Sequence, residues 1–290
     1  MEFFPRIICD LLSKIYCLIQ TNKFCTKREL YYQNVSWYGK QSIIDNLVDD
    51  IACLFKVPRR ELHVLATSKG CIAGDLKFKD AEGNYVDCSA TISGVLVPSD
   101  VQGIECLCTE AKFVLLIEKD ATFQKLLDDG FTRNFYPSIL ITGKGFPDIN
   151  TRELLHKLWT DMEIPILALM DADPFGIEIL LIFKYGSLSL AYDVHNLATP
   201  SIQWLGIHPT DIERLKIPDD ALQPLSKLDL SKIADMMQRP YMTHNPEWKN
   251  QVETIHRMKK KAEIQSLSMI SPSFLTEVYL PSKIRLGGWI

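Results

Sequence analysis

The segment TKRELYYQN (26–34) combines one guanidinium and two phenols within a few residues. A phenol has a pKa near 10, so its oxygen attacks well at neutral pH only where a neighbour favours the phenolate. In a helix, Arg28 and Tyr32 are four residues apart and share a face, where a guanidinium can stabilise a phenolate and a phosphate oxygen. Tyr31 lies about 100° around such a helix. The spacing therefore predicts Tyr32 as a nucleophile beside Arg28 and Tyr31 as a packing residue; the alternative is that both rings pack.

A second group consists of three carboxylates that each follow an apolar run. Glu118 stands in KFVLLIEKD (112–120), and Asp171 and Asp173 stand in IPILALMDAD (164–173). The carboxyl ends of parallel strands form one edge of an α/β sheet, where ligands bind. Carboxylates without nearby histidine or cysteine suit a hard cation, so the pattern predicts a Mg²⁺ site. The alternative is that these acids only cap the helices that follow them.

Two other protein classes share the Asp-x-Asp pattern. Haloacid-dehalogenase-type phosphatases use the first aspartate as a nucleophile on the first strand, whereas Asp171 follows the third predicted strand of its sheet and Pro174 replaces the usual Thr or Val. Sugar-nucleotide transferases also carry such a pair, but no segment here indicates a nucleotide-sugar pocket. Neither class accounts for the pattern.

The composition is that of a soluble globular protein. The 290 residues are 47% hydrophobic and 23% charged, enough for one large domain or two ordinary ones. No uninterrupted apolar run approaches the roughly 20 residues that span a bilayer, so no membrane is expected as a partner. The first segment, FFPRIICDLLSKIYCLIQ, carries Arg6, Asp10 and Lys14 at helical spacing, which favours an amphipathic helix over a signal peptide.

Charge and cysteine usage limit the partners and the compartment. The formal net charge of −4 argues mildly against a nucleic-acid partner, but VPRREL (57–62) and HRMKKKAEIQ (256–265) are locally basic. Either segment is alternatively a solvated surface. All 8 cysteines fall within the first 108 residues and none forms a CxxC pair. They are predicted to be reduced, mostly buried thiols, which suits the cytosol or nucleus.

The first part of the chain has the pattern of a winged-helix module. Helices are predicted over 4–19, from 26 onward and over 40–55, the second of them opened by a Thr26/Glu29 capping box. A strand over 62–67 and a hairpin over 75–94 follow. The turn-rich VLVPSDVQG (95–103) is the predicted boundary, so residues 1–103 form the first domain.

Beyond this boundary, strands alternate with helices. The strands are expected over 112–120, 138–145 and 164–173, and the helices over 121–129, 150–162 and 176–187, with a further helix near 250–268. This order predicts a parallel, Rossmann-like sheet with right-handed crossovers over residues 104–290, extended at its C-terminus. The expected fold is therefore a two-domain protein of the α+β and α/β classes.

A strand-end glutamate followed by Asp-x-Asp resembles the Toprim fold of topoisomerases, primases and some nucleases. With a tyrosine-bearing winged helix upstream, the chain resembles the A subunit of topoisomerase VI. From about residue 10 to the end it is most similar to the sporulation-eleven family of meiotic break-forming proteins. The segments that carry this resemblance are TKRELYY, TSKGCIAGDL, AKFVLLIEKDATFQKLLDD, ITGKGFPDINTR, DADPFGIEI, KYGS, IQWLGI, RPY, KAEIQ and YLPSKIRLGGWI.

The resemblance implies a nuclear isomerase of the ATP-hydrolysing type IIB topoisomerase class that makes meiotic DNA double-strand breaks for recombination. Its nucleophile closes the pattern R-[DE]-[IL]-x-Y, a position that Tyr32 occupies. The attack would leave a covalent 5′-phosphotyrosine. The other implied site residues are the Mg²⁺ ligands Glu118, Asp171 and Asp173, and the DNA-lining residues Lys69, Lys144 and Phe146.

The implied partners are double-stranded DNA, a second copy of the chain and a topoisomerase VI B-like subunit. In related enzymes the tyrosine of one subunit works with the metal site of the other, so two breaks require a homodimer. Family members usually carry a longer N-terminal extension that is implicated in binding the B-like subunit. This chain begins almost at its first helix. The short N-terminus favours a rival function, a non-catalytic or truncated DNA-binding or assembly subunit. A weaker alternative is a metal-dependent nuclease that uses water in place of Tyr32.

Overall fold

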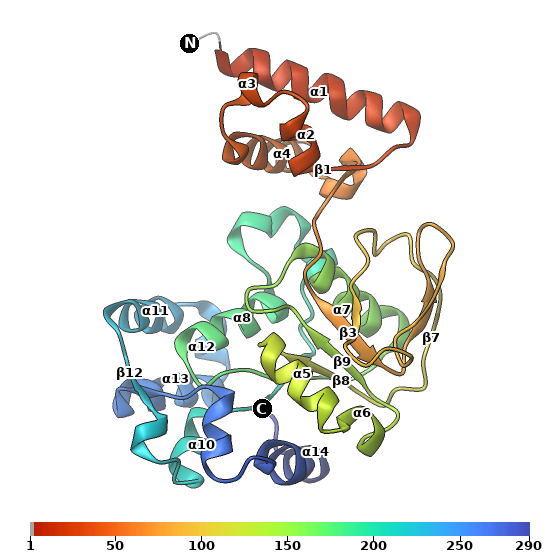
Figure 1. Cartoon of the computed structure of the whole chain (residues 1–290). Helices are drawn as coiled ribbons and strands as arrows, with labels where there is room; N and C mark the ends of the chain where they lie inside the picture. The colour runs from red at the N-terminus through yellow and green to blue at the C-terminus, as the bar shows by residue number, and fades with distance from the viewer. Residues whose placement is uncertain (1–2) are drawn as a thin grey trace.

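The computed structural model describes residues 3–290, which form a small helical part above a larger sheet-containing part (Figure 1). One apolar core holds the small part together. Its elements are α1 (Phe3–Thr21), β1 (Cys25–Thr26), α2 (Lys27–Tyr32), α3 (Val35–Tyr38), α4 (Gln41–Phe55), the 3₁₀ turn η1 (Arg59–Leu62) and β2 (Val64–Leu65), with β1 parallel to β2. The predicted helices over 4–19 and 40–55 are confirmed.

Amphipathic patterning explains both long helices of the small part. In α1, Ile7, Leu11 and Ile15 are buried, while Asp10 and Lys14 form an ion pair of 3.3 Å on another face. The apolar stripe of α4 is buried as expected from Ile44 to Ala52. Phe55 at its end is 56% exposed, because the helix extends past the core there.

The larger part is built on a six-stranded sheet in the order β11-β10-β8-β9-β3-β6. Four strands are parallel: β8 (Val114–Ile117), β9 (Ile139–Thr142), β10 (Ile166–Leu169) and β11 (Gln203–Gly206). Strands β3 (Cys71–Gly74) and β6 (Val95–Leu96) complete one edge in antiparallel pairing. The predicted parallel sheet is confirmed, and its central strands β8 and β10 are apolar throughout because both faces are covered.

Alternate residues of β8 show the three layers. Val114 and Leu116 belong to the core with α7 (Ile149–Met162) and α8 (Pro174–Tyr185), whereas Leu115 and Ile117 belong to the opposite core. That opposite core contains α5 (Asp120–Asp128), α6 (Phe131–Asn134) and the C-terminal segment with the π-helix η5 (Phe274–Tyr279) and α14 (Leu280–Leu286). The strand-helix order therefore produces helices on both faces of the sheet, as right-handed crossovers require.

The predicted hairpin forms, but it packs with the larger part. Strands β4 (Lys77–Lys79) and β5 (Tyr85–Asp87) pair antiparallel, and β7 (Glu105–Cys108) extends them to a three-stranded sheet. Phe78 of β4 is fully buried in the core of the main sheet. Since β3 and β6 also precede residue 103, strands on both sides of the predicted boundary share one sheet. The winged-helix assignment and the division at 103/104 stay predictions.

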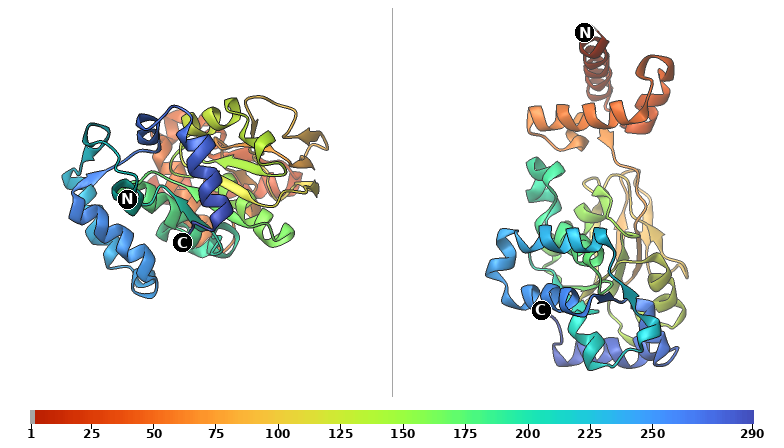
Figure 2. Two further views of the ribbon diagram at one scale, coloured as in Figure 1. Left: turned by 90° about the horizontal axis from the view of Figure 1, so that it is seen from below. Right: turned by 90° about the vertical axis from the view of Figure 1, so that its left-hand side faces the viewer.

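The last hundred residues wrap one end of the sheet (Figure 2). Their elements are η2 (Leu188–Asp193), α9 (Val194–Leu197), α10 (Pro209–Arg214), η3 (Asp219–Ala221), β12 (Gln223–Pro224), α11 (Lys227–Met237), α12 (Pro240–His244), α13 (Pro246–Met258), β13 (Lys260–Lys261) and η4 (Ile264–Met269). The helix predicted near 250–268 is thus too long. It ends at Met258, because Lys259 adopts a left-handed conformation with φ of 52°.

One sequence expectation needs correction, and one apolar stretch needs an explanation. All 8 cysteines, which lie within the described part of the chain, are free, but only Cys25, Cys71 and Cys88 are buried. The stretch Pro174–Leu197 is long and apolar enough to cross a membrane by length and composition alone. In the fold it is α8 followed by two short helices, and α8 packs against the main sheet, so the apolar composition is explained by a core helix.

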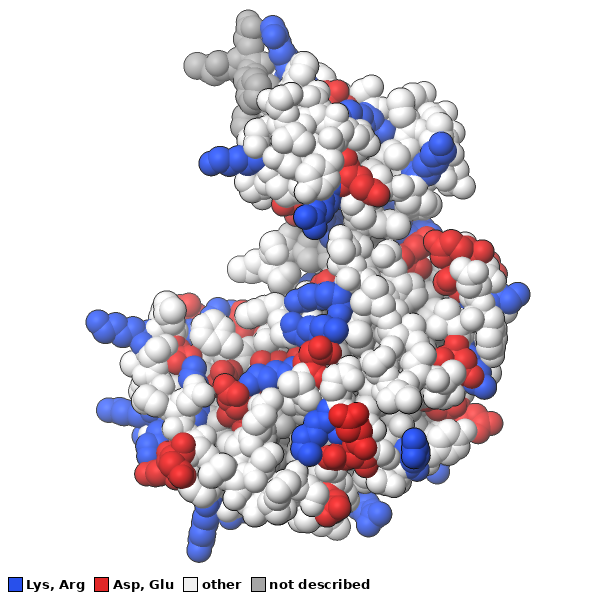
Figure 3. All heavy atoms as spheres, in the orientation of Figure 1, with Lys and Arg blue, Asp and Glu red and all other residues white. Residues whose placement is uncertain are grey.

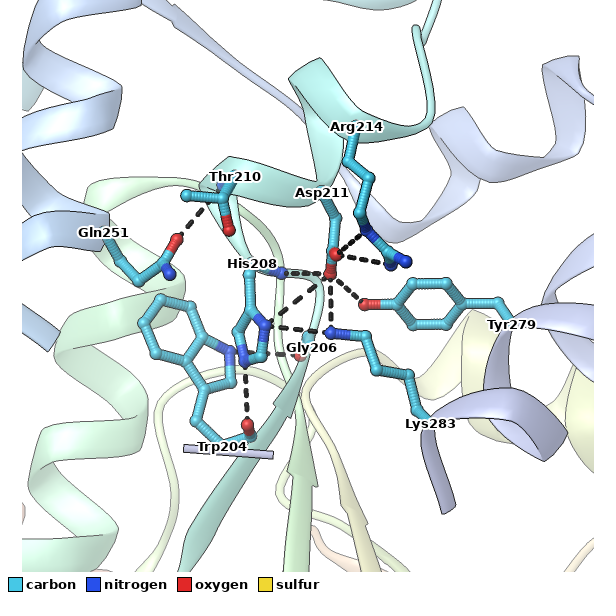
Figure 4. Close-up of polar contacts among 9 residues, drawn as sticks. All are labelled: Trp204, Gly206, His208, Thr210, Asp211, Arg214, Gln251, Tyr279 and Lys283. Atoms are coloured by element: carbon cyan, nitrogen blue, oxygen red, sulfur yellow. Dashed lines mark hydrogen bonds and ion pairs between the residues drawn. The ribbon is translucent and has the colours of Figure 1, made fainter. Parts of the chain in front are cut away.

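A buried polar network fastens the C-terminal segment to the sheet (Figure 4). Asp211 at the start of α10 is its centre. Its Oδ2 accepts a hydrogen bond from Tyr279 Oη at 2.6 Å and pairs with Lys283 Nζ at 2.9 Å, and its Oδ1 pairs with Arg214 at 2.7 Å. Each buried charge therefore has a partner, as burial requires.

His208 joins this network to β11 in its neutral form. Its Nδ1 faces Lys283 Nζ at 2.9 Å, and its Nε2 lies 2.8 Å from the carbonyl oxygen of Trp204. An ammonium can only donate, so Nδ1 accepts and Nε2 carries the proton. Burial and the positive charge of Lys283 lower the pKa of His208 to about 4, against the favourable influence of Asp211.

Acid is therefore expected to destabilise the fold through His208. Between about pH 6.5 and pH 4, His208 is protonated in the unfolded chain but stays neutral in the folded one. This group then lowers the free energy of unfolding by up to about 3 kcal/mol as the pH falls through that window. Burial alone would raise the pKa of Asp211, but Lys283 and the hydrogen bond from Tyr279 lower it below its usual value. Protonation of Asp211 therefore also destabilises the fold, but only at lower pH. Urea unfolding at pH 7, 6, 5 and 4 measures the effect.

The matched control uses another histidine. His208→Gln is expected to flatten the pH dependence between 4 and 6.5, while His244→Gln, at an exposed position, leaves it unchanged. An equal pH dependence in wild type and His208→Gln would contradict the assignment.

Candidate active site

Helix α2 begins with the predicted capping box. Thr26 Oγ1 accepts a hydrogen bond from the backbone N–H of Glu29 at 3.2 Å, and the Glu29 carboxylate accepts one from the N–H of Thr26. Leu30 is fully buried and fixes the rotation of the helix against the core. These contacts define the helix phase and hence the directions of Arg28 and Tyr32.

The two tyrosines of α2 have different environments. Tyr32 is 60% exposed, with Arg28 Nη2 lying 3.4 Å from its oxygen and the guanidinium carbon 5.7 Å from its ring centroid. Tyr31 packs partly against the helical core, and its hydroxyl donates to the carbonyl of Gly39 at 3.2 Å. Thus Tyr32 presents an accessible oxygen beside a permanent cation, while the Tyr31 oxygen is engaged by the protein.

A hollow of about 630 Å³ opens in front of Tyr32. The small part contributes basic and aromatic side chains to it, and the loop before α7 contributes Pro147 and Asp148 from the larger part. In Figure 3 the molecule is indented between its two parts, and Lys and Arg side chains gather just below the indentation. The tyrosine therefore faces a hollow lined by both parts of the chain, in which Lys27, Arg28 and Arg59 outnumber Asp45 and Asp148.

The three acids lie at the carboxyl edge of β8 and β10. Glu118 Oε2 accepts a hydrogen bond from the backbone N–H of Asp171 at 2.8 Å. Asp171 accepts one from the N–H of Ile264 at 2.8 Å through Oδ1 and pairs with Lys119 Nζ at 2.7 Å through Oδ2. Asp173 caps α8 by accepting from the N–H of Gly176 at 2.5 Å. Capping is thus seen for Asp173, whereas the Glu118 carboxylate binds the backbone that follows β10.

Electrostatics shows how closely these acids interact. Burial, together with the carboxylates of Asp171 and Asp173, raises the pKa of Glu118 to about 8. Burial likewise raises the pKa values of Asp171 and Asp173 above their usual range. A buried cluster of hard oxygen donors fits a divalent cation, which would relieve this repulsion. Within residues 3–290, however, no three acid, histidine or cysteine side chains form a ready-made metal site.

The expected DNA-lining residues lie on neighbouring loops. Lys69 Nζ donates to the carbonyl of Lys144 at 3.4 Å, and Lys144 Nζ pairs with Asp120 at 3.3 Å. Phe146 is 47% exposed on the same loop. The N–H of Gly145 donates to the carbonyl of Glu118 at 2.8 Å. The GKGFP loop therefore runs from the acid edge to the hollow that contains Tyr32.

The fold brings the predicted residues together in two groups. Arg28 lies with Tyr32, and Glu118 lies with Asp171 and Asp173, but none of the three acids lines the hollow in front of Tyr32. Sequence reasoning missed Lys119, which bridges Asp171 and Glu263 at 2.7 and 2.9 Å. Its position directly after Glu118 was the available signal.

Comparison with known proteins identifies both parts. The family model for the Toprim domain of the topoisomerase 6 A subunit and Spo11 matches residues 113–284, and the model described as "Type IIB DNA topoisomerase" matches residues 6–64. The second match covers the small helical core, and the first covers the parallel sheet with its C-terminal segment.

Whole-chain relatives agree with these matches. The chain is 50% identical to meiotic recombination protein SPO11 of Mus musculus and 49% identical to that of Homo sapiens, in each case over 98% of this chain and 72% of the relative. It is 37% identical to the A subunit of DNA topoisomerase 6 of Arabidopsis thaliana, over 98% of this chain and 66% of the relative.

These relatives are A subunits. They do not support the expectation that this chain hydrolyses ATP, because ATP hydrolysis belongs to the B subunit. The matches to the Toprim and type IIB models, together with the identity along nearly the whole length, show that the chain belongs to the family of Spo11 and the topoisomerase 6 A subunit.

Proposed function

We propose that this chain cleaves double-stranded DNA by transesterification. The Tyr32 oxygen attacks a backbone phosphorus and forms a tyrosine–phosphate bond while the bond from phosphorus to the 3′ oxygen breaks. The phenol loses its proton, and the departing 3′ oxygen gains one to become a hydroxyl. The observation that carries this proposal is the Arg28 guanidinium beside the exposed Tyr32 oxygen, at 3.4 Å and within a basic hollow.

Arg28 serves the reaction in two ways. Its permanent charge favours the phenolate, and its spare N–H groups can hold a non-bridging phosphate oxygen during attack. Glu118, Asp171 and Asp173 would hold Mg²⁺, since their charges repel one another and their donors are hard oxygens. When bound, Mg²⁺ would neutralise the phosphate charge that grows in the transition state.

The separation of the two groups supports a dimer. None of the acids lines the Tyr32 hollow, so the tyrosine of one chain would act with the acids of a second copy. We infer that two chains hold the duplex between them, each cutting one strand, and that a B-like subunit completes the assembly. The relatives at 49% and 50% identity are named meiotic recombination proteins, which supports a role in forming meiotic double-strand breaks. A role in meiotic recombination would place the chain in the nucleus.

A second candidate function is a non-catalytic DNA-binding or assembly subunit with the same fold. It is favoured by the engagement of Asp171, whose oxygens are taken by Lys119 and the N–H of Ile264. Such a chain would bind DNA without attacking it.

The deciding experiment looks for DNA joined to tyrosine. The protein is incubated with duplex DNA and Mg²⁺, denatured, trimmed with nuclease and analysed by mass spectrometry of its peptides. The proposal expects a nucleotide adduct on the peptide containing Tyr32. DNA breaks without an adduct would indicate a water-using nuclease, and binding without breaks would indicate the assembly subunit.

A further inference from the structure

Arg59 is a second arginine of the Tyr32 hollow. It is the first residue of η1 and lines the hollow together with Lys27, Arg28 and Tyr32. Its side chain is 13% exposed, and it lines both the hollow and a small neighbouring pocket. Arg59 belongs to the segment VPRREL (57–62), which is locally basic in the sequence.

The protein leaves Arg59 incompletely paired. Its Nη1 lies 3.7 Å from Asp49 Oδ1, but the same oxygen takes the ammonium of Lys27 at 2.7 Å. Its Nε is buried and has no hydrogen-bond acceptor among the described residues. A buried donor without an acceptor destabilises the fold, and more so where the group is charged. Arg59 therefore holds donor capacity that a ligand in the hollow can use.

Four further carboxylates lie near this arginine: Asp45 and Asp148 line the hollow, and Glu153 and Asp193 line the neighbouring pocket. Asp148 accepts three backbone hydrogen bonds, from Lys69, Gly70 and Thr151. Asp45 accepts one from the side-chain amide of Gln41. Among the described residues, none of these four carboxylates forms an ion pair with Arg59, whose one ion pair is the long contact with Asp49. Its N–H groups can therefore bind an anion that enters the hollow.

We infer that Arg59 binds a DNA phosphate other than the one that Tyr32 attacks, and so sets the position of the strand in the hollow. The inference rests on the proposed DNA-cleaving function. Arg28 already contacts the Tyr32 oxygen, and Arg59 reaches the hollow from a different element, so the two arginines suit two phosphates of one strand. Contacts of this kind position DNA without reading its sequence.

The test measures how duplex binding by the full chain depends on salt. Fluorescence anisotropy without Mg²⁺, between about 50 and 200 mM salt, gives the slope of log K against log salt. Each lost phosphate contact reduces that slope by about 0.9. Arg59→Gln is expected to reduce it by about one and to weaken binding about tenfold at the lowest salt. Arg59→Lys, which keeps the charge, is expected to retain the slope.

Arg60 provides the matched control, because it carries the same charge one residue later. Its Nε and Nη2 bind the two oxygens of Asp100 at 2.6 and 3.0 Å, so Arg60→Gln is expected to keep the wild-type slope. If Arg59→Gln does not fold, Arg59→Met, which preserves the packed stem, replaces it.

An unchanged slope in the Arg59 variant, an equal reduction in Arg60→Gln, or a wild type that does not bind DNA would each overturn the inference. Failure of the proposed function looks different. There the wild type binds DNA with Mg²⁺ present but forms no tyrosine adduct, whatever the slope of the Arg59 variant.

Discussion

Tyr32→Phe is expected to abolish covalent protein–DNA adducts and strand breaks, lowering both to background. The substitution removes only the oxygen that would attack phosphorus, and that oxygen is exposed and contacted by Arg28 at 3.4 Å. Because Phe keeps the ring, the variant should fold and bind duplex DNA as the wild type does. Denaturing gels of end-labelled DNA, with and without protease digestion, measure adducts and breaks separately.

Tyr31→Phe is the matched control. It removes the neighbouring phenol oxygen, whose hydroxyl donates to the Gly39 carbonyl at 3.2 Å, and so loses one exposed hydrogen bond. Such a bond contributes roughly 1 kcal/mol to folding, which leaves substantial cleavage activity. Normal adduct formation by Tyr32→Phe would contradict the assignment of Tyr32 as the nucleophile. Loss of adducts in Tyr31→Phe alone would identify Tyr31 as the nucleophile.

Glu118→Gln is expected to reduce cleavage at least about a hundredfold and to weaken Mg²⁺ binding. Glutamine keeps the shape of the side chain and an oxygen that can accept from the N–H of Asp171, which now lies at 2.8 Å from Glu118. The variant therefore loses the ability to ionise when Mg²⁺ binds, with little loss of packing. A double change of Asp171 and Asp173 to asparagine should have the same effect. Cleavage assays and calorimetric titration with Mg²⁺ measure the two consequences.

A surface acid separates this effect from a general change in charge. Glu253→Gln makes the same substitution at an exposed position of α13, outside the group of Glu118, Asp171 and Asp173. It is expected to change neither cleavage nor Mg²⁺ binding. If folded Glu118→Gln titrates with Mg²⁺ as the wild type does, the metal-site proposal fails.

Local patterns in the sequence determined most elements that position the candidate residues. The Thr26/Glu29 capping box specified where α2 begins, and a helix of known start has known directions for Arg28 and Tyr32. Apolar runs specified β8, β9 and β10 because strands buried on both faces leave no polar alternation. Each of these signals acts between residues that are close in the chain, so sequence spacing is enough to interpret it.

Contacts between distant segments were decided only by the tertiary structure. The hairpin β4–β5 was predicted, but its packing on the main sheet depends on Phe78 entering a core built from later residues. The engagement of Asp171 by Ile264 joins residues 93 apart. Exposure of five of the eight cysteines likewise depends on which helix faces find partners.

Some features of the candidate active site follow from the sequence, and others follow only from the tertiary structure. Sequence spacing alone distinguished Tyr32 from Tyr31, because both side chains leave one short helix whose phase is set locally. The hollow in front of Tyr32, and the place of Arg59 in it, required η1 and the loop before α7 to meet across the chain. Hydrogen bonds between residues far apart in the chain join these segments, such as those from the N–H groups of Lys69 and Gly70 to Asp148. Spacing along the chain does not specify which distant residues meet in this way.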